Sequence, residues 1–166
     1  QAGEIFGGAT RPDRAAVMKD YALSLSKEGN RENGRVVFRK VCATCHRLDG
    51  VGKVVGPNLA GLNNRAPATY LTAILDPNRA VEAKWMMFVA KTKDGLTLAG
   101  SVAEETSSAI TLVGVDGSRT NVRRSELQSL ESTGRSLMPE GLETAINPSQ
   151  MSDLLTYLRS TGRPLK

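Results

Sequence analysis

The pentapeptide Cys42-Ala43-Thr44-Cys45-His46 constrains the chain most, because it contains both cysteines and the only histidine of the 166 residues. Two thiols three positions apart, followed at once by an imidazole, form the C-x-x-C-H pattern of c-type haem attachment. Each thiol can bond to one vinyl group of the same haem, and the histidine can then ligate the iron. The sequence therefore predicts one haem c, attached covalently through Cys42 and Cys45, with His46 as an axial ligand.

The scarcity of histidine and cysteine also argues against other kinds of site. A structural zinc site needs about four ligands, and a Ser-His or Cys-His nucleophile needs an imidazole that is free to act as a base. A thioredoxin-like dithiol expects a βαβ context, whereas the residues before Cys42 have a helical pattern. A disulfide, or two buried thiols beside an incidental histidine, remains the alternative that the motif leaves open.

Charge and hydropathy narrow the classes of partner. The formal net charge is +5 at pH 7, but the lysines and arginines are scattered. This distribution argues against nucleic-acid binding and favours an acidic protein partner. No stretch approaches the roughly 20 apolar residues that span a bilayer, so we expect no transmembrane segment. Haem of this kind is attached in export compartments. We therefore expect a periplasmic or otherwise exported protein whose signal sequence is not present in this chain.

Apolar residues at helical spacing predict helices on both sides of the motif. Residues 1–30 are interpreted as a leader or linker with one helix at about 12–27, and residues 31–166 as the haem domain. Within that domain we expect helices at 31–42, at 67–75, and from Pro148 to just before Gly162. For the last helix, Asn147 and Gln150 form a capping box.

Between the third and last helices, at about residues 85–130, the pattern becomes strand-like, and two Asp-Gly pairs mark hairpin turns. Strands are expected at 85–93, 96–103, 109–115 and 118–123, with a short last segment through Leu130. The sequence thus predicts an inserted β-meander, which we interpret as a docking or shielding element or as a plain solvated face. One side of it could be basic, since its hairpins carry Lys91, Lys93, Arg119, Arg123 and Arg124.

A second axial ligand for the iron cannot be a histidine, so the methionines are the candidates. Met138 lies in an irregular loop before the last helix, and Pro139 restricts its backbone to extended conformations. Met86 and Met87 are the remaining candidates. Metal-bound histidines usually donate their other ring N–H to an acceptor. The carbonyl of Pro57 is the candidate acceptor, and a plain Gly-Pro turn is the alternative.

These residues together resemble a class I cytochrome c. The family's order of haem-binding residues is followed by Cys42, Cys45, His46, Gly56, Pro57 and Met138. Its contact between the first and last helices is matched by Gly34, Phe38, Leu154 and Tyr157. The resemblance covers about residues 33–161 outside the insertion. It implies a mainly α fold, the class I cytochrome c helical fold around one haem c, with an inserted small antiparallel β-sheet.

With its insertion, the chain looks like the haem-binding domain described in planctomycete and verrucomicrobial proteins. That likeness rests on the stretches VCATCHRLDGVGKVVGPNLAGL, AILDPNRAV, TKDG and STGRSLMPEGLE. It implies an electron-transfer module rather than an enzyme, with a redox protein or a fused dehydrogenase-type domain as partner. Two alternatives stay open: a haem enzyme or gas sensor with a labile distal site, and a partner-binding module in which haem is secondary.

Overall fold

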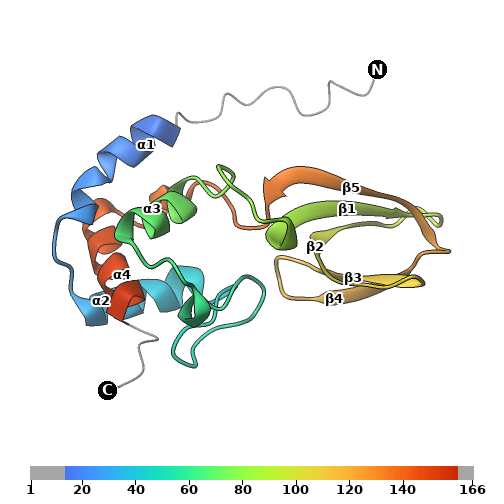
Figure 1. The fold of residues 1–166 in the computed structure, drawn as a ribbon, viewed down its shortest axis with the longest axis horizontal. Coiled ribbons are helices and arrows are strands. Elements are labelled where there is room, and N and C mark those ends of the chain that lie inside the picture. The colour runs from blue at the N-terminus through green and yellow to red at the C-terminus, as the bar shows by residue number, and fades with distance from the viewer. Residues whose placement is uncertain (1–13, 161–166) are drawn as a thin grey trace.

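The computed structural model describes residues 14–160, which form a helical lobe and a β lobe (Figure 1). The helical lobe, residues 14–85 and 137–160, contains α1 (Arg14–Asp20), α2 (Arg31–Val37), α3 (Pro67–Leu75) and α4 (Pro148–Ser160). The β lobe, residues 86–136, contains β1 (Met86–Thr92), β2 (Thr97–Glu105), β3 (Ala109–Val113), β4 (Arg119–Arg123) and β5 (Leu127–Ser136). The leader at 1–10 and the expected stop signals Gly162 and Pro164 lie outside the described residues.

The helices begin where their capping signals predict. At α4, the Gln150 N–H donates to Asn147 Oδ1 at 2.9 Å, and the Asn147 N–H donates to Gln150 Oε1 at 3.0 Å. This reciprocal pair confirms the predicted capping box. The bounds of α3 confirm the helix predicted at 67–75. The helix expected near 12–27 is instead α1 followed by a separate 3-10 turn over Ala22–Leu25.

The helix predicted from Arg31 to Cys42 changes character halfway. After α2 ends at Val37, residues Phe38–Cys42 form a π-helical turn, in which the Ala43 N–H donates to Phe38 O at 2.9 Å. The wider turn places one extra residue before the haem-attachment motif. Such π-turns are frequent at functional sites, and this one ends at Cys42, the first residue of the motif.

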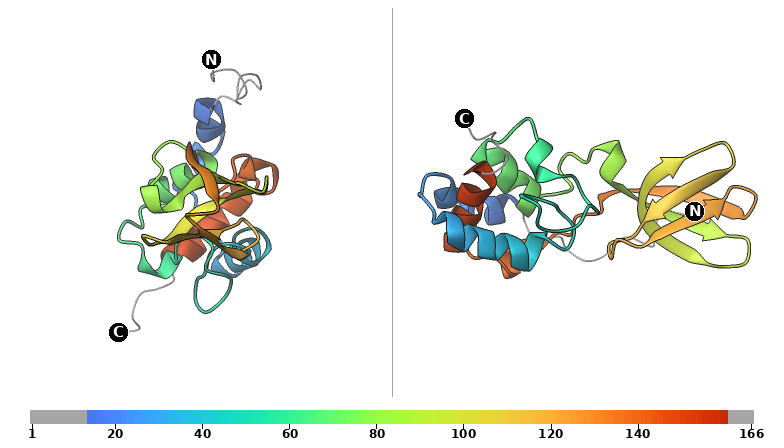
Figure 2. Two further views of the ribbon diagram at one scale, coloured as in Figure 1. Left: turned by 90° about the vertical axis from the view of Figure 1, so that its right-hand side faces the viewer. Right: turned by 90° about the horizontal axis from the view of Figure 1, so that it is seen from below.

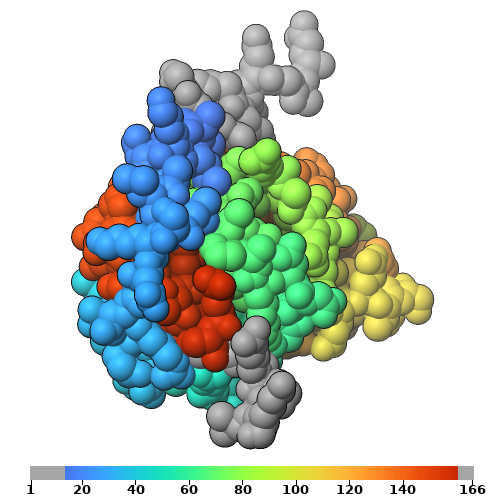
Figure 3. Space-filling model, turned by 60° about the vertical axis from the view of Figure 1, so that its left-hand side comes forward, coloured from blue at the N-terminus to red at the C-terminus, as the bar shows by residue number. Residues whose placement is uncertain are grey.

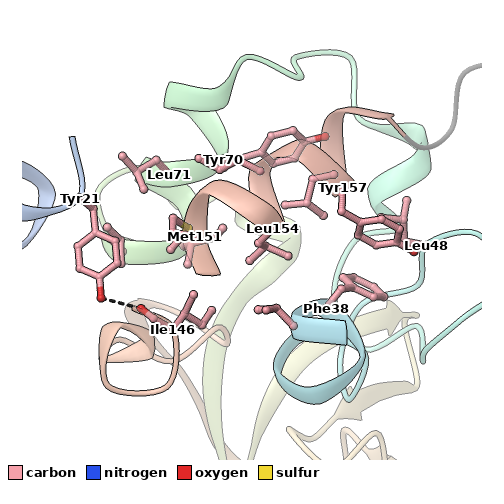
Figure 4. Close-up of a cluster of buried hydrophobic side chains, with 14 residues drawn as sticks. Tyr21, Phe38, Leu48, Tyr70, Leu71, Ile146, Met151, Leu154 and Tyr157 are labelled. Atoms are coloured by element: carbon pink, nitrogen blue, oxygen red, sulfur yellow. Dashed lines mark hydrogen bonds between the residues drawn. The ribbon is translucent and has the colours of Figure 1, made fainter. Parts of the chain in front are cut away.

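The close crossing of α2 and α4 at Gly34 is confirmed. A Cβ atom on Gly34 would lie 2.8 Å from Tyr157 Cβ and closer still to the Asp153 carbonyl oxygen. Only glycine lets the two backbones approach this closely. One turn on, the rings of Phe38 and Tyr157 pack with centroids 5.6 Å apart. Both rings belong to the fully buried core of the helical lobe, together with Leu154 (Figure 4).

The β lobe is a five-stranded antiparallel sheet in the order β4-β3-β2-β1-β5. The last strand differs from the prediction: β5 runs to Ser136 rather than ending near residue 130, and it returns to pair with β1. The sheet is therefore not a simple meander. Periodicity missed the extension because Gly134 adopts a positive φ of 67° and the register of β5 against β1 is irregular.

The sheet curls on itself. Residues 97–100 of β2 pair with β1, whereas residues 101–105 pair with β3 across a bulge near Val102. Residues 124–126 join β4 to β5, which are the two edge strands, so these edges must approach each other. Bulges bend strands in this way, and the result is a small, partly open barrel. Figure 2 shows the curled strands extending away from the helices.

Each lobe has its own hydrophobic core. The core of the β lobe consists of Ala90, Ile110, Leu112 and Val122, and none of these belongs to the helical core. Helices account for 37% and strands for 26% of the structure. The expectation of a mainly α protein therefore describes the helical lobe and understates the size of the sheet.

The arginines of the β lobe do not form a free basic face. Arg119 contacts Glu104 at 2.6 Å, Arg123 contacts Glu126 at 2.5 Å, and Arg124 is paired with Glu105. Sequence patterning missed these pairs because two of them join different strands. The expected basic side is therefore largely neutralised by carboxylates.

The helical lobe is closed by packing around α4. In the space-filling view, α4 lies between the N-terminal helices and α3 (Figure 3). The N-terminal segment forms hydrogen bonds with residues just before α4 and at its first position. The Tyr21 hydroxyl donates to Ile146 O at 2.6 Å, and Ser24 Oγ donates to Pro148 O at 2.8 Å.

No helix within residues 14–160 is both long and apolar enough to cross a membrane.

Candidate haem site

His46 is held by its Nδ1 atom, which lies 3.0 Å from the Pro57 carbonyl oxygen. The carbonyl can only accept, so Nδ1 carries the proton and Nε2 keeps its lone pair. Burial lowers the pKa of His46, against a smaller opposing effect of the Pro57 hydrogen bond. A neutral imidazole with a free Nε2 is the form that ligates a metal. The hydrogen bond between His46 and the Pro57 carbonyl, a candidate contact from the sequence, is therefore present in the structure.

Two glycines leave room for this imidazole. A Cβ atom on Gly56 would lie 2.7 Å from His46 Cε1 and 3.1 Å from Nδ1, and one on Gly52 would collide with the His46 carbonyl oxygen. Gly52 also has a φ of +96°, which L side chains rarely adopt. The glycine-rich loop after the motif therefore folds tightly around His46.

Cys42 and Cys45 are free, half-buried thiols. Burial, with a smaller contribution from Cys45, raises the pKa of Cys42 to about 12. Reactive dithiols of the thioredoxin kind need a lowered thiol pKa, so the environment of Cys42 is the opposite of what that alternative requires. No disulfide joins Cys42 and Cys45.

The three candidate methionines lie in different places. Met138 is half-buried and packs against the core of the helical lobe, which also carries His46. Met86 and Met87 begin β1 in the β lobe, where Met86 Sδ lies 2.7 Å from the Ser132 hydroxyl at an exposed position. The fold therefore places Met138 in the same lobe as His46 and assigns Met86 a polar neighbour of its own.

The donors present suit haem c. They comprise an imidazole with a free Nε2, a thioether in the same lobe, two thiols three positions apart, and a glycine cradle around the imidazole. Across residues 14–160, no group of three or more His, Cys, Asp and Glu side chains could hold a metal ion. The residues thus fit a covalently attached haem.

Sequence reasoning missed two neighbours of the site. The turn between β3 and β4 reaches back to the motif, where Cys45 Sγ lies 3.8 Å from the Val115 carbonyl oxygen. Asn78, after α3, hydrogen-bonds on both sides of Met138. The Asp116-Gly117 pair identified the first turn as a hairpin, but no local signal indicates where a hairpin points. Asn78 carries no signal beyond its place in a turn after Pro77.

Comparisons with known proteins agree with this site. Residues 31–108 match the sequence model of the family described as Cytochrome c. A curated relative described as "Cytochrome c", from Stellaria longipes, is 38% identical over 61 residues, which cover 36% of this chain and 56% of that relative. The chain thus spans about half the length of this relative. Taken with the geometry of His46 and its motif, these matches support the cytochrome c family for this chain.

Proposed function

We propose that this chain is a mono-haem c-type cytochrome that serves as an electron-transfer protein or as an electron-accepting module. The observation that carries the proposal is the unique C-x-x-C-H motif, whose His46 is hydrogen-bonded through Nδ1 to Pro57 with Nε2 left for a metal. The finer assignment is a class I cytochrome c of the planctomycete and verrucomicrobial type, with residues 31–166 as the haem domain and the β lobe inserted in it.

Each site residue has a distinct role in this proposal. Cys42 and Cys45 attach the haem, whose iron, when bound, gains and loses one electron. His46 would hold the iron through Nε2, and the Pro57 carbonyl fixes the ring orientation and tautomer of His46. Met138 would hold the iron through its thioether sulfur, a ligand that favours the ferrous state and raises the reduction potential. The protein contributes attachment, orientation and tuning.

The attachment is tested by extraction of protein produced with a c-type maturation system. After denaturation and acid-organic extraction, the haem should stay with the polypeptide, because two thioether bonds hold it. The Cys42→Ala/Cys45→Ala double variant is the control and should release any haem it carries. Free extraction of haem from the parent protein would overturn the proposal.

The second axial ligand is tested by Met138→Ala, with Met86→Ala and Met87→Ala as matched controls. Ferric iron bound to methionine sulfur has a far-red absorption band. Met138→Ala should abolish this band and lower the potential, whereas both controls should keep the band. A spectrum unchanged in Met138→Ala would show that another residue ligates the iron.

The same spectra distinguish the alternative function. A haem enzyme or gas sensor with a labile distal site would lack the sulfur band and bind external ligands readily in the parent protein. We also propose that the protein is exported and that it exchanges electrons with a redox protein or with a fused dehydrogenase-type domain. A partner-binding module with incidental haem would instead bind its partner equally well in the Cys42→Ala/Cys45→Ala variant.

A further inference from the structure

The side chain of Asn78 bridges the two ends of the segment that carries Met138. Asn78 Oδ1 accepts the backbone N–H of Ser136 at 2.7 Å, and Asn78 Nδ2 donates to Glu140 Oε1 at 2.5 Å. These partners lie two residues before and two residues after Met138. A single half-buried amide therefore spans the loop from outside it, across 58 and 62 positions of sequence.

We propose that Asn78 is a positioning residue that holds the Met138 thioether in place as an axial ligand. The inference rests on the proposed function, because it takes Met138 as the ligand. Asn78 acts on Met138 indirectly, through the backbone of Ser136 and the side chain of Glu140. Its role is to restrict the conformations open to residues 136–140.

A carboxamide meets both requirements at this position. Ser136 presents an N–H donor and Glu140 presents a carboxylate acceptor, so the bridging group must accept at one end and donate at the other. This pairing also settles the orientation of the Asn78 amide, since a flipped amide would face donor with donor and acceptor with acceptor. An aspartate could satisfy Ser136 but would place a second carboxylate against Glu140.

Asn78 joins residues 136–140 to the end of α3, and the neighbouring hydrogen bonds join them elsewhere. The Leu137 N–H donates to Trp85 O at 3.1 Å, and the Met138 N–H donates to Ser136 Oγ at 3.1 Å. These bonds fix the exit from β5. Asn78 adds a connection to the end of α3, whose Leu71 and Leu75 are buried in the helical core. Residues 136–140 are thus bonded both at the exit from β5 and to the turn after α3.

The test compares three variants of the full-length, haem-loaded protein. Asn78→Asp should remove one bond and add repulsion, whereas Glu140→Gln alone keeps an acceptor for Asn78. The double variant Asn78→Asp/Glu140→Gln restores a donor–acceptor pair with the polarity reversed and should recover the parent behaviour. Asn121→Asp is the matched control, because the Asn121 amide also donates to a side chain, Thr111 Oγ1, but within the β lobe.

Two measurements follow the variants. In the ferric protein, Asn78→Asp should weaken the methionine–iron band and raise the affinity for cyanide, which displaces a loosened methionine, by about tenfold. Hydrogen exchange of the Ser136 amide, which reports on the tie without reference to iron, should also become about tenfold faster, because repulsion from Glu140 displaces the introduced carboxylate from Ser136. Glu140→Gln, Asn121→Asp and the double variant should stay near the parent in both measurements.

The outcomes separate this inference from the proposed function. Loss of the band in Met138→Ala, together with an unchanged band and cyanide affinity in Asn78→Asp, would overturn the inference alone. A parent protein without the band would overturn the methionine assignment, and the inference with it. An equal effect of Asn78→Asp and the double variant would also overturn the inference, because repacking at Asn78 rather than the hydrogen bond would then account for it.

Discussion

At the scale of single residues, the site depends on how His46 is enclosed. The imidazole contacts the Pro57 carbonyl on one side, and Gly56 leaves space on the other. A histidine free to rotate would lose rotamer entropy on binding iron, whereas this one is already oriented. The Gly56-Pro57 dipeptide therefore contributes in two ways. The Pro57 carbonyl oxygen accepts a hydrogen bond from His46, and the absence of a side chain at Gly56 leaves room for the imidazole.

Gly56→Ala should disturb this arrangement. The added methyl would lie 2.7 Å from His46 Cε1, and relieving that overlap should cost about 1–3 kcal/mol of the free energy of unfolding. Gly61→Ala is the matched control, since a Cβ atom there meets nothing within 4 Å. Urea unfolding of the haem-loaded variants measures both. Equal stability of Gly56→Ala and Gly61→Ala would mean that His46 moves aside without cost.

At the scale of elements, α1 acts as a brace on the segment between Met138 and α4. Arg14 Nη2 contacts Glu143 at 2.8 Å, with side chains 12% and 18% exposed, and Arg14 Nη1 donates to the Leu75 carbonyl oxygen at 2.9 Å. The Tyr21 hydroxyl adds bonds to the carbonyls of Glu143 and Ile146. Because this ion pair is shielded from water, it should contribute more than an exposed pair.

Arg14→Met should therefore destabilise the protein in a pH-dependent way. The hydrogen bond from Arg14 lowers the pKa of Glu143 in the folded state, so the stabilisation is present above the ordinary glutamate pKa of about 4.3. The variant should lose about 1–3 kcal/mol at pH 7, and this difference should shrink as the pH falls below about 4. Urea unfolding at pH 7 and pH 3 measures the difference. Arg123→Met, whose ion pair is exposed, should change little at either pH.

The α2–α4 crossing gives a second prediction at this scale. Gly34→Val should overpack the contact with Asp153 and Tyr157, because backbone atoms of α4 cannot move aside. We expect a loss of about 1–3 kcal/mol in the free energy of unfolding. Val36→Ala, on the exposed face of α2, is the control for a change in the same helix. Thermal unfolding that is unchanged in Gly34→Val would contradict the close crossing.

At the scale of the whole molecule, the charges near the motif differ from those of the β lobe. The arginines of the β lobe are paired with glutamates. Lys40 and Arg47 are exposed and flank the C-x-x-C-H motif in sequence. Paired charges contribute little to the long-range field. Steering of an anionic redox partner should therefore depend on the cations beside the motif.

Charge reversal tests this distribution. Lys40→Glu/Arg47→Glu should slow electron exchange with an acidic redox protein at low salt, and added salt should reduce the difference from the parent. Arg123→Glu/Arg124→Glu changes the net charge equally and should have the smaller effect. Stopped-flow mixing at several ionic strengths measures the rates. Equal slowing by both pairs would show that net charge alone controls the encounter.

The sequence by itself determined the local features of this protein. The C-x-x-C-H motif, the Asn147 cap, the two Asp-Gly turns and the glycine at the α2–α4 crossing each depend on residues a few positions apart or on one small side chain. Such patterns report directly on backbone geometry. They are enough to indicate the helices, the inserted strands and the candidate haem-attachment residues.

Only the tertiary structure decided which distant residues meet. The return of β5 to β1, the ion pairs of Arg119 and Arg124, the Val115 carbonyl beside Cys45 and the Asn78 bridge across Met138 join positions 15 to 70 residues apart. Local patterns carry no information about such contacts, because they depend on how a curled sheet and a helical core pack against each other. The haem motif can thus be recognised from the sequence, whereas the hydrogen bonds that Asn78 makes around Met138 form only once both lobes have folded.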